Sequence, residues 1–221
     1  KNIIGKDKKI IVDASQSHGA KINNNFNDTI GDLNTFSFYP TKVLGGYGEG
    51  GMILTNNKKC FEYIKKTRNW GNSKNKIWEN HSFNYRMDEI QASVINNKLK
   101  YLDQEIARRN KIAKIYNDFF IKKGVRIQKI EKNILSSYYI YPILIKNRDK
   151  IQKKLKEKGI ETMIHYKYPI HKSLAYKNLK FSNVNLKFSE KLAKEQISLP
   201  IHSNIKINQI EYIIKILNKI L

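Results

Sequence analysis

The chain has 221 residues, of which 40% are apolar, so it is long enough to bury one large core or two modest ones. Its single cysteine, Cys60, excludes an internal disulfide framework and a cysteine-rich zinc site. A formal net charge of +23 would suit nucleic acid, yet A/T-rich codons explain an excess of Lys, Asn and Ile equally well, so we do not expect a nucleic-acid partner.

Membrane association is not expected either. No run of apolar residues reaches the roughly 18 that a membrane helix requires. The start of the chain, KNIIGKDKKIIVDAS, lacks the charged and then apolar pattern of a signal peptide. These two observations predict a cytoplasmic protein without a membrane partner.

The first half of the chain predicts short strands and helices in alternation. Three apolar runs are expected to be strands, namely KKIIVDAS (8–15), NTFSFYP (34–40) and GMILTNN (51–57). Asn56 and Asn57 are turn or cap residues before a helix at 58–68. After a polar loop at 73–82, apolar residues recur every three, four or seven positions over 87–120, which predicts a pair of helices with one apolar face.

The second half continues this alternation. In chain order we expect a strand at 136–145, a helix at 148–159 closed by Gly159, a strand at 160–166, a short strand at 197–200 and an amphipathic helix at 207–221. Strands that alternate with helices predict an α/β architecture.

Lys42 lies two residues after Pro40, which must end its strand because proline lacks an N–H group. The glycines that follow, at positions 45, 46, 48, 50 and 51, suit a loop wrapped around a ligand. Asp13 ends the first strand, where ligand sites of open α/β sheets lie. A lysine amine and a carboxylate that holds a pyridinium nitrogen protonated are the groups that pyridoxal phosphate chemistry requires. The alternative for Asp13 is a turn residue or a helix N-cap.

Five blocks of sequence together resemble one family. They are, in order, IVDASQSHGA, GDLNTFSFYPTKVLGGYGEGGMILTN, FNYRMDEIQASVINNKLKYLDQEIARRNKIAKIY, IHYKYPIHKSLAY and ISLPIH. They are similar to the signatures of the DegT/DnrJ/StrS aminotransferases, which are pyridoxal phosphate enzymes of fold-type I, the aspartate-aminotransferase-like fold. The resemblance implies transfer of an amino group, usually from glutamate, to a keto sugar carried on a nucleotide diphosphate.

The resemblance also implies a domain organisation. Residues 1–110 would be the second half of the large cofactor-binding domain, and residues 111–221 the small α+β domain. In the family the strand that ends at the aspartate lies well inside the chain, whereas Asp13 is close to the start. We therefore expect an N-terminally truncated fragment that is inactive alone.

The same resemblance assigns cofactor contacts to five residues. It implies that Lys42 forms the Schiff base and that Asp13 is the partner of the pyridine nitrogen. Gln16 would contact the phenolic oxygen of the cofactor, and Ser37 its phosphate. Asn84 would reach the phosphate from a neighbouring subunit, which implies a homodimer with shared active sites. From the residues alone, Ser37 is the polar face of a strand.

Substrate contacts are implied for Arg86, at the shared site, and for His171, contributed by the small domain. Without the resemblance, Asn84 and Arg86 would cap the helix that starts near Met87, and His171 would be a structural histidine. The spacing of His165 and His171, with no carboxylate or cysteine cluster nearby, argues against a metal site.

Lys42 itself favours transamination within the family, because some members are dehydrases that carry histidine at this position. Two other classes of function stay open. One is a cofactor-binding regulator or pseudoenzyme on the same fold. The other is a basic nucleic-acid-binding protein, whose affinity would fall steeply with salt.

Overall fold

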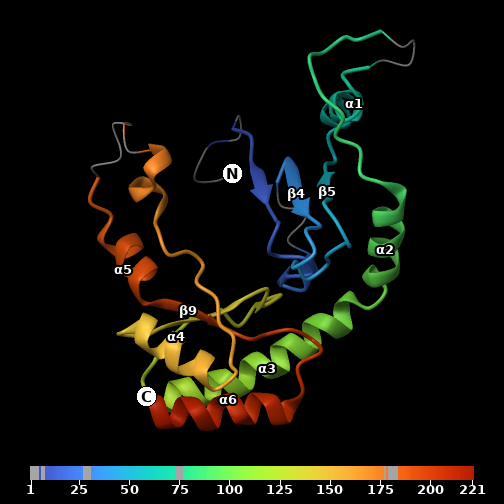
Figure 1. Cartoon of the computed structure of the whole chain (residues 1–221). Coiled ribbons are helices and arrows are strands. Elements are labelled where there is room, and N and C mark those ends of the chain that lie inside the picture. The colour runs from blue at the N-terminus through green and yellow to red at the C-terminus, as the bar shows by residue number, and fades with distance from the viewer. Residues whose placement is uncertain (1–4, 6–7, 27–30, 73–76, 177, 179–183) are drawn as a thin grey trace. The chain divides into compact units, whose positions relative to one another are not determined.

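The computed structural model describes residues 5, 8–26, 31–72, 77–176, 178 and 184–221 (Figure 1). The chain divides into two compact units. Unit 1 comprises Lys1–Ile106 and Glu131–Ser137, and unit 2 comprises Ala107–Ile130 and Tyr138–Leu221. Within the described part of the chain, no helix combines the length and the apolar character needed to cross a bilayer.

The main sheet of unit 1 has three strands, in the order β1 (Ile11–Asp13), β4 (Leu33–Ser37) and β5 (Gly51–Leu54). β1 runs parallel to β4, and β5 runs antiparallel to it. β1 and β5 lie inside runs predicted as strands, and β4 starts one residue before the predicted run 34–40, so the three predictions are confirmed, although each strand is shorter than its run. Pro40 lies beyond the end of β4, as its missing N–H group requires.

The two faces of this sheet differ in chemistry. Side chains alternate along a strand, so Phe36 packs on one face together with Val12, while Thr35 and Ser37 lie on the other. Asp13 pairs with Thr35 across the strands and shares that second face. The first face therefore packs into the core of unit 1, and the second carries Asp13, Thr35 and Ser37.

Helices follow the sheet in chain order. α1 (Lys58–Thr67) begins after Asn57, whose side chain accepts a hydrogen bond of 3.1 Å from the Cys60 N–H, which confirms the predicted cap. The predicted helical pair is α2 (Glu89–Leu99) and α3 (Leu102–Lys122). Ile95 of α2 is buried in the core of unit 1 with Phe36, Phe38, Leu44 and Ala14.

A second small sheet in unit 1 joins segments that are distant in sequence. Its order is β3 (Asn25–Phe26), β2 (Lys21–Ile22) and β7 (Ile134–Leu135). Lys21 pairs with Leu135, and the Asn23 N–H donates to the Asn133 carbonyl at 2.9 Å. Strands of two residues carry no periodic signal, so the sequence did not predict them.

Unit 2 contains one antiparallel sheet, in the order β6 (Arg126–Ile127), β8 (Tyr141–Leu144) and β9 (Gln196–Leu199). Its further helices are α4 (Arg148–Glu157), α5 (Lys187–Glu195) and α6 (Ile207–Ile220), with short 3-10 turns at Ile170–Lys172 and Leu174–Tyr176. Strands β8 and β9, helix α4 with its closing Gly159 (φ 73°) and helix α6 confirm the predictions. The predicted strand at 160–166 is wrong, because only Met163 forms a bridge there, with Ser198.

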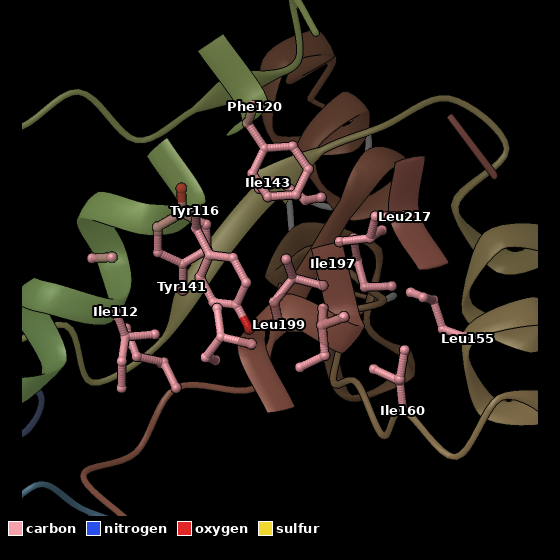
Figure 2. Packing of buried hydrophobic residues seen from close by; sticks show 14 of the residues in the cluster. Ile112, Tyr116, Phe120, Tyr141, Ile143, Leu155, Ile160, Ile197, Leu199 and Leu217 are labelled. Atoms are coloured by element: carbon pink, nitrogen blue, oxygen red, sulfur yellow. The ribbon is translucent and has the colours of Figure 1, made fainter. Parts of the chain in front are cut away.

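The core of unit 2 is built from aromatic and branched side chains that point toward one another from α3, α4, α6 and the sheet (Figure 2). Tyr116 and Phe120 of α3 are fully buried against Tyr141 of β8. The Tyr116 hydroxyl donates to the Pro200 carbonyl at 3.0 Å, so its polar group is satisfied inside the core.

Candidate functional site

Asp13 and Lys42 lie at one edge of the main sheet of unit 1. β1 and β4 are adjacent and parallel, so their carboxyl ends meet at the same edge. Asp13 is the last residue of β1. Lys42 follows β4 in a tight turn, in which its N–H donates to the Tyr39 carbonyl at 2.9 Å. The positive charge of Lys42 contributes to a lowered pKa of Asp13, so the two predicted groups interact electrostatically.

Asp13 is held as a carboxylate. Hydrogen bonds from Ser15 are the main cause of its lowered pKa, and they include the Ser15 N–H, which donates to Oδ1 at 3.0 Å. The charge of Lys42 acts in the same direction, and burial opposes it weakly. The bond to the Ser15 N–H is an Asx turn, so Asp13 is also the turn residue that the alternative interpretation predicted. The side chain nevertheless remains exposed.

Ser37 and Gln16 lie near this edge. Ser37 shares the polar face of the sheet with Asp13, and its Oγ accepts from the Tyr39 N–H at 3.3 Å. Gln16 is exposed, and its backbone carbonyl accepts from the buried Ser137 hydroxyl at 3.0 Å. One amine, one ionised carboxylate and a hydroxyl at the carboxyl ends of β1 and β4 form a donor set that fits pyridoxal phosphate.

His18 is a residue of this region that sequence reasoning missed. It is only 2% exposed and packs on the apolar face of the sheet, with its ring 5.4 Å from Phe36 and 5.9 Å from Phe38. It lines a cavity of about 240 Å³ with Leu44 and Leu102. A single histidine between Ser and Gly carries no periodic signal, so nothing in the sequence indicated its burial.

Burial is the main cause that lowers the pKa of His18 to about 4, and the charge of Lys42 adds to it. The backbone of Ser37 raises the pKa of His18 slightly. It does not form a hydrogen bond of standard geometry with either ring nitrogen. The ring is therefore neutral in the folded protein at neutral pH.

This buried histidine predicts a loss of stability in mild acid. The unfolded chain binds a proton near the ordinary pKa of about 6.5, whereas the folded chain does so only near 4. Stability therefore falls as the pH drops from about 6.5 toward 4, by about 2 kcal/mol between pH 7 and pH 5. Urea unfolding at the two pH values measures this difference. The variant His18→Leu should lose most of it, and His81→Gln, at an exposed histidine, should keep it. Equal pH dependence in wild type and His18→Leu would contradict the assignment.

Asn84 and Arg86 lie together on the surface of unit 1. The Asn84 Oδ1 accepts from the Arg86 backbone N–H at 3.2 Å and from its Nε at 3.1 Å. Both side chains are exposed. The N-cap of α2 is Asp88, so the alternative that Asn84 and Arg86 cap this helix is wrong. The predicted contact of Asn84 with the cofactor phosphate and that of Arg86 with the substrate stay predictions.

His171 belongs to unit 2 and is 6% exposed. Its Nε2 lies 3.0 Å from the Glu190 Oε1, and Lys172 Nζ lies 3.9 Å from the same oxygen. The hydrogen bond with His171 is the main cause of the lowered pKa of Glu190. His171 is therefore a buried histidine paired with Glu190, as expected of a structural residue. Its predicted contact with substrate stays a prediction.

The last question about the site is whether it could hold a metal ion. Among the residues that the structure describes, no group of three or more His, Cys, Asp or Glu side chains could hold a metal ion.

Comparison with known proteins extends over almost the whole chain. The sequence profile described as the DegT/DnrJ/EryC1/StrS aminotransferase family matches residues 5–218. A protein of Geobacillus stearothermophilus named "Pleiotropic regulatory protein" is 34% identical, over 93% of this chain and 56% of its own length. The dTDP-3-amino-3,6-dideoxy-alpha-D-galactopyranose transaminase of Aneurinibacillus thermoaerophilus is 33% identical, over 99% of this chain and 60% of its own length.

A solved structure shows the same fold. The crystal structure of S. venezuelae DesV in complex with a ketimine intermediate superposes with a TM-score of 0.91 at 29% identity, over 96% of this chain and 57% of that one. This chain therefore spans little more than half the length of the proteins it matches. The predicted aspartate-aminotransferase-like α/β fold is confirmed, and the chain belongs to the DegT/DnrJ/EryC1/StrS aminotransferase family.

Proposed function

We propose that the protein is a pyridoxal phosphate-dependent aminotransferase that moves an amino group from an amino-acid donor, glutamate in most of the family, to a keto group of a nucleotide-linked sugar. The observation that carries this proposal is the pair of Lys42 and Asp13 at the carboxyl ends of the parallel strands β1 and β4. The transaminase of Aneurinibacillus thermoaerophilus supports it as a relative of the same family.

Each residue of the polar edge has a role in this proposal. Lys42 would bind the cofactor covalently through Nζ, and Asp13 would keep the pyridine nitrogen protonated. Ser37 would donate to the phosphate and Gln16 to the phenolic oxygen. When bound, pyridoxal phosphate supplies an electron sink for the negative charge that forms at the α-carbon of the donor.

The amine of Lys42 would also move the proton. Once released from the cofactor, Nζ would take the proton from the α-carbon of the donor, and in the second half-reaction it would return a proton to the former keto carbon of the sugar. Lysine suits this exchange because an amine can both accept and donate a proton.

The proposal extends to the assembly. Unit 1 would belong to the large cofactor-binding domain and unit 2 would be the small domain, in line with the predicted domains 1–110 and 111–221. Asn84 would reach the cofactor phosphate of a partner subunit, with Arg86 and His171 on the substrate side, so the active form would be a homodimer. Residues 1–221 span little more than half the length of the relatives, so we expect them to be inactive alone. A cytoplasmic location stays a prediction.

A regulatory protein on the same fold is the second candidate, because the Geobacillus stearothermophilus relative bears a regulatory name. It would bind the cofactor without turnover of a sugar. The presence of Asp13 beside Lys42 favours the enzyme, since a regulator needs Lys42 to hold the cofactor but has no need of a carboxylate that makes the cofactor reactive.

The test uses the purified protein in its full natural length. It is incubated with pyridoxal phosphate, reduced with borohydride and digested, and the modified peptide is located by mass spectrometry. We expect the modification on Lys42, and we expect the visible absorption of the unreduced protein to bleach when glutamate is added. Modification of Lys42 without bleaching by any amino acid would favour the regulator. Scattered modification of surface lysines would contradict both candidates.

A further inference from the structure

The glycines after Lys42 face a helix. A Cβ atom built on Gly46 would lie 2.8 Å from the Gln91 Oε1, and one on Gly48 would lie 3.2 Å from the Gln91 Nε2. Likewise, a Cβ on Gly50 would meet the Met87 sulfur at 2.6 Å. These positions are glycine because side chains of the α2 region occupy the adjacent space. The sequence had suggested that a ligand occupies it.

Two side chains of α2 bind this glycine loop, residues 45–51. The Tyr47 N–H donates to the Gln91 Oε1 at 2.7 Å. The Lys98 ammonium donates to the Gly45 carbonyl at 2.7 Å and lies 4.9 Å from the centre of the Tyr47 ring. Gln91 and Lys98 are two helical turns apart, so they lie on the same face of α2. The loop is thus held at both a donor and an acceptor of its backbone.

The glycine loop also contacts the turn that contains Lys42, the residue on which the proposed function depends. The Gly46 N–H donates to the Phe38 carbonyl at 2.8 Å, which closes the turn that contains Lys42. A Cβ on Gly45 would lie 2.5 Å from the Pro40 carbonyl oxygen and 2.7 Å from that of Tyr39. Because Gly45 and Gly46 pack directly on the backbone of this turn, a shift of the loop moves Lys42 with it.

The helix that holds the loop is itself fixed to the sheet. Ile95, between Gln91 and Lys98 on α2, is 5% exposed and packs in the core of unit 1 with Phe36, Phe38 and Leu44. Close-packed cores transmit strain and deform little. α2 is therefore a rigid base relative to β4, the strand that precedes Lys42.

We infer that Gln91 and Lys98 are positioning residues that clamp the glycine loop 45–51 and thereby set the position of Lys42. The inference rests on the proposed function only for the role of Lys42, and the clamp itself stands on contacts within unit 1. Small displacements of a reacting group are costly in catalysis, so residues that fix such a group through its backbone control the rate without touching substrate.

Hydrogen exchange of the Tyr47 amide tests the clamp, since this N–H donates to Gln91. In Gln91→Met the side chain keeps its length and loses its acceptor, and we expect the amide to exchange about 10-fold faster, as the loss of one hydrogen bond implies. In Gln91→Glu an acceptor remains, and we expect the exchange to stay close to that of wild type. Gln104→Met, at an exposed glutamine of α3, is the matched control.

The reactivity of Lys42 tests its positioning and does not require the cofactor. Competitive labelling with acetic anhydride, read by mass spectrometry, reports the nucleophilicity of each lysine amine. We expect Gln91→Met to change the labelling rate of Lys42 by about 3-fold or more, and we expect Gln91→Glu to restore it toward wild type. The rate at which pyridoxal phosphate modifies Lys42 should change in parallel.

Three results would overturn the inference. They are unchanged exchange of the Tyr47 amide in Gln91→Met, an equal change in Gln104→Met, and faster exchange that leaves the acetylation of Lys42 unaltered. Failure of pyridoxal phosphate to modify Lys42 in the wild-type protein would instead contradict the proposed function, and the exchange and acetylation results would still decide on the clamp.

Discussion

In the protein of full natural length, the variant Lys42→Arg is expected to lose the covalent attachment of pyridoxal phosphate and to transaminate more than about 10³-fold more slowly than wild type. Arginine keeps the positive charge beside Asp13, but its guanidinium stays protonated and is no nucleophile. The substitution therefore removes the amine chemistry and leaves the electrostatic pair. Borohydride trapping and the rate of amino transfer from glutamate are the two measurements.

Lys111→Arg is the matched control for this experiment, because Lys111 is an exposed lysine of α3 in unit 2. It should retain both the attachment and the rate of wild type. A Lys42→Arg protein that trapped the cofactor in equal yield would show that another lysine is the attachment site, and the proposed role of Lys42 would have to be abandoned.

For Asp13→Asn we expect a different result, in which the cofactor still attaches to Lys42 but amino transfer slows by about 10²-fold or more. The carboxylate of Asp13 is held ionised by Ser15 and by the charge of Lys42. An amide has the same shape without the negative charge, so it cannot keep a pyridine nitrogen protonated. The protein then binds the cofactor with a weaker electron sink.

The measurement is kcat/KM for the amino donor together with the yield of borohydride trapping. Asp118→Asn, an exposed aspartate of α3, controls for the loss of one surface charge. Equal losses in both variants would assign the effect to net charge. The amide oxygen of Asn can still accept from the Ser15 N–H, so loss of trapping together with activity in Asp13→Asn would indicate that cofactor binding itself requires the negative charge of Asp13.

The sequence was informative where one local signal determines structure. Pro40 marks the end of β4, and the polar ends of the apolar runs place Asp13 and Lys42 at the tips of neighbouring strands. Asn57 was identified as a cap because a side-chain oxygen three residues before a backbone N–H is a local arrangement. These predictions needed no knowledge of distant contacts.

The sequence was less informative where distant residues decide. The glycines at 46 and 48 are explained by Gln91, more than forty positions away, which no local pattern indicates. The run at 160–166 has strand composition, but one bridge from Met163 is all that it forms, so tertiary pairing overrode propensity. α5 was missed although Phe188 and Leu192 are four residues apart, because the helix has nine residues and so short an apolar pattern is a weak signal.

The pairing of β2 with β7 has a consequence for biosynthesis. Lys21 is joined to Leu135, and the Ser137 hydroxyl to the Gln16 carbonyl, so the first unit needs residues that are translated long after its main sheet. After β1, β4 and β5 have been synthesised, about eighty further residues must be added before β7 can pair with β2. During this interval the β2 edge that later pairs with β7 has no partner, and chaperones could bind it.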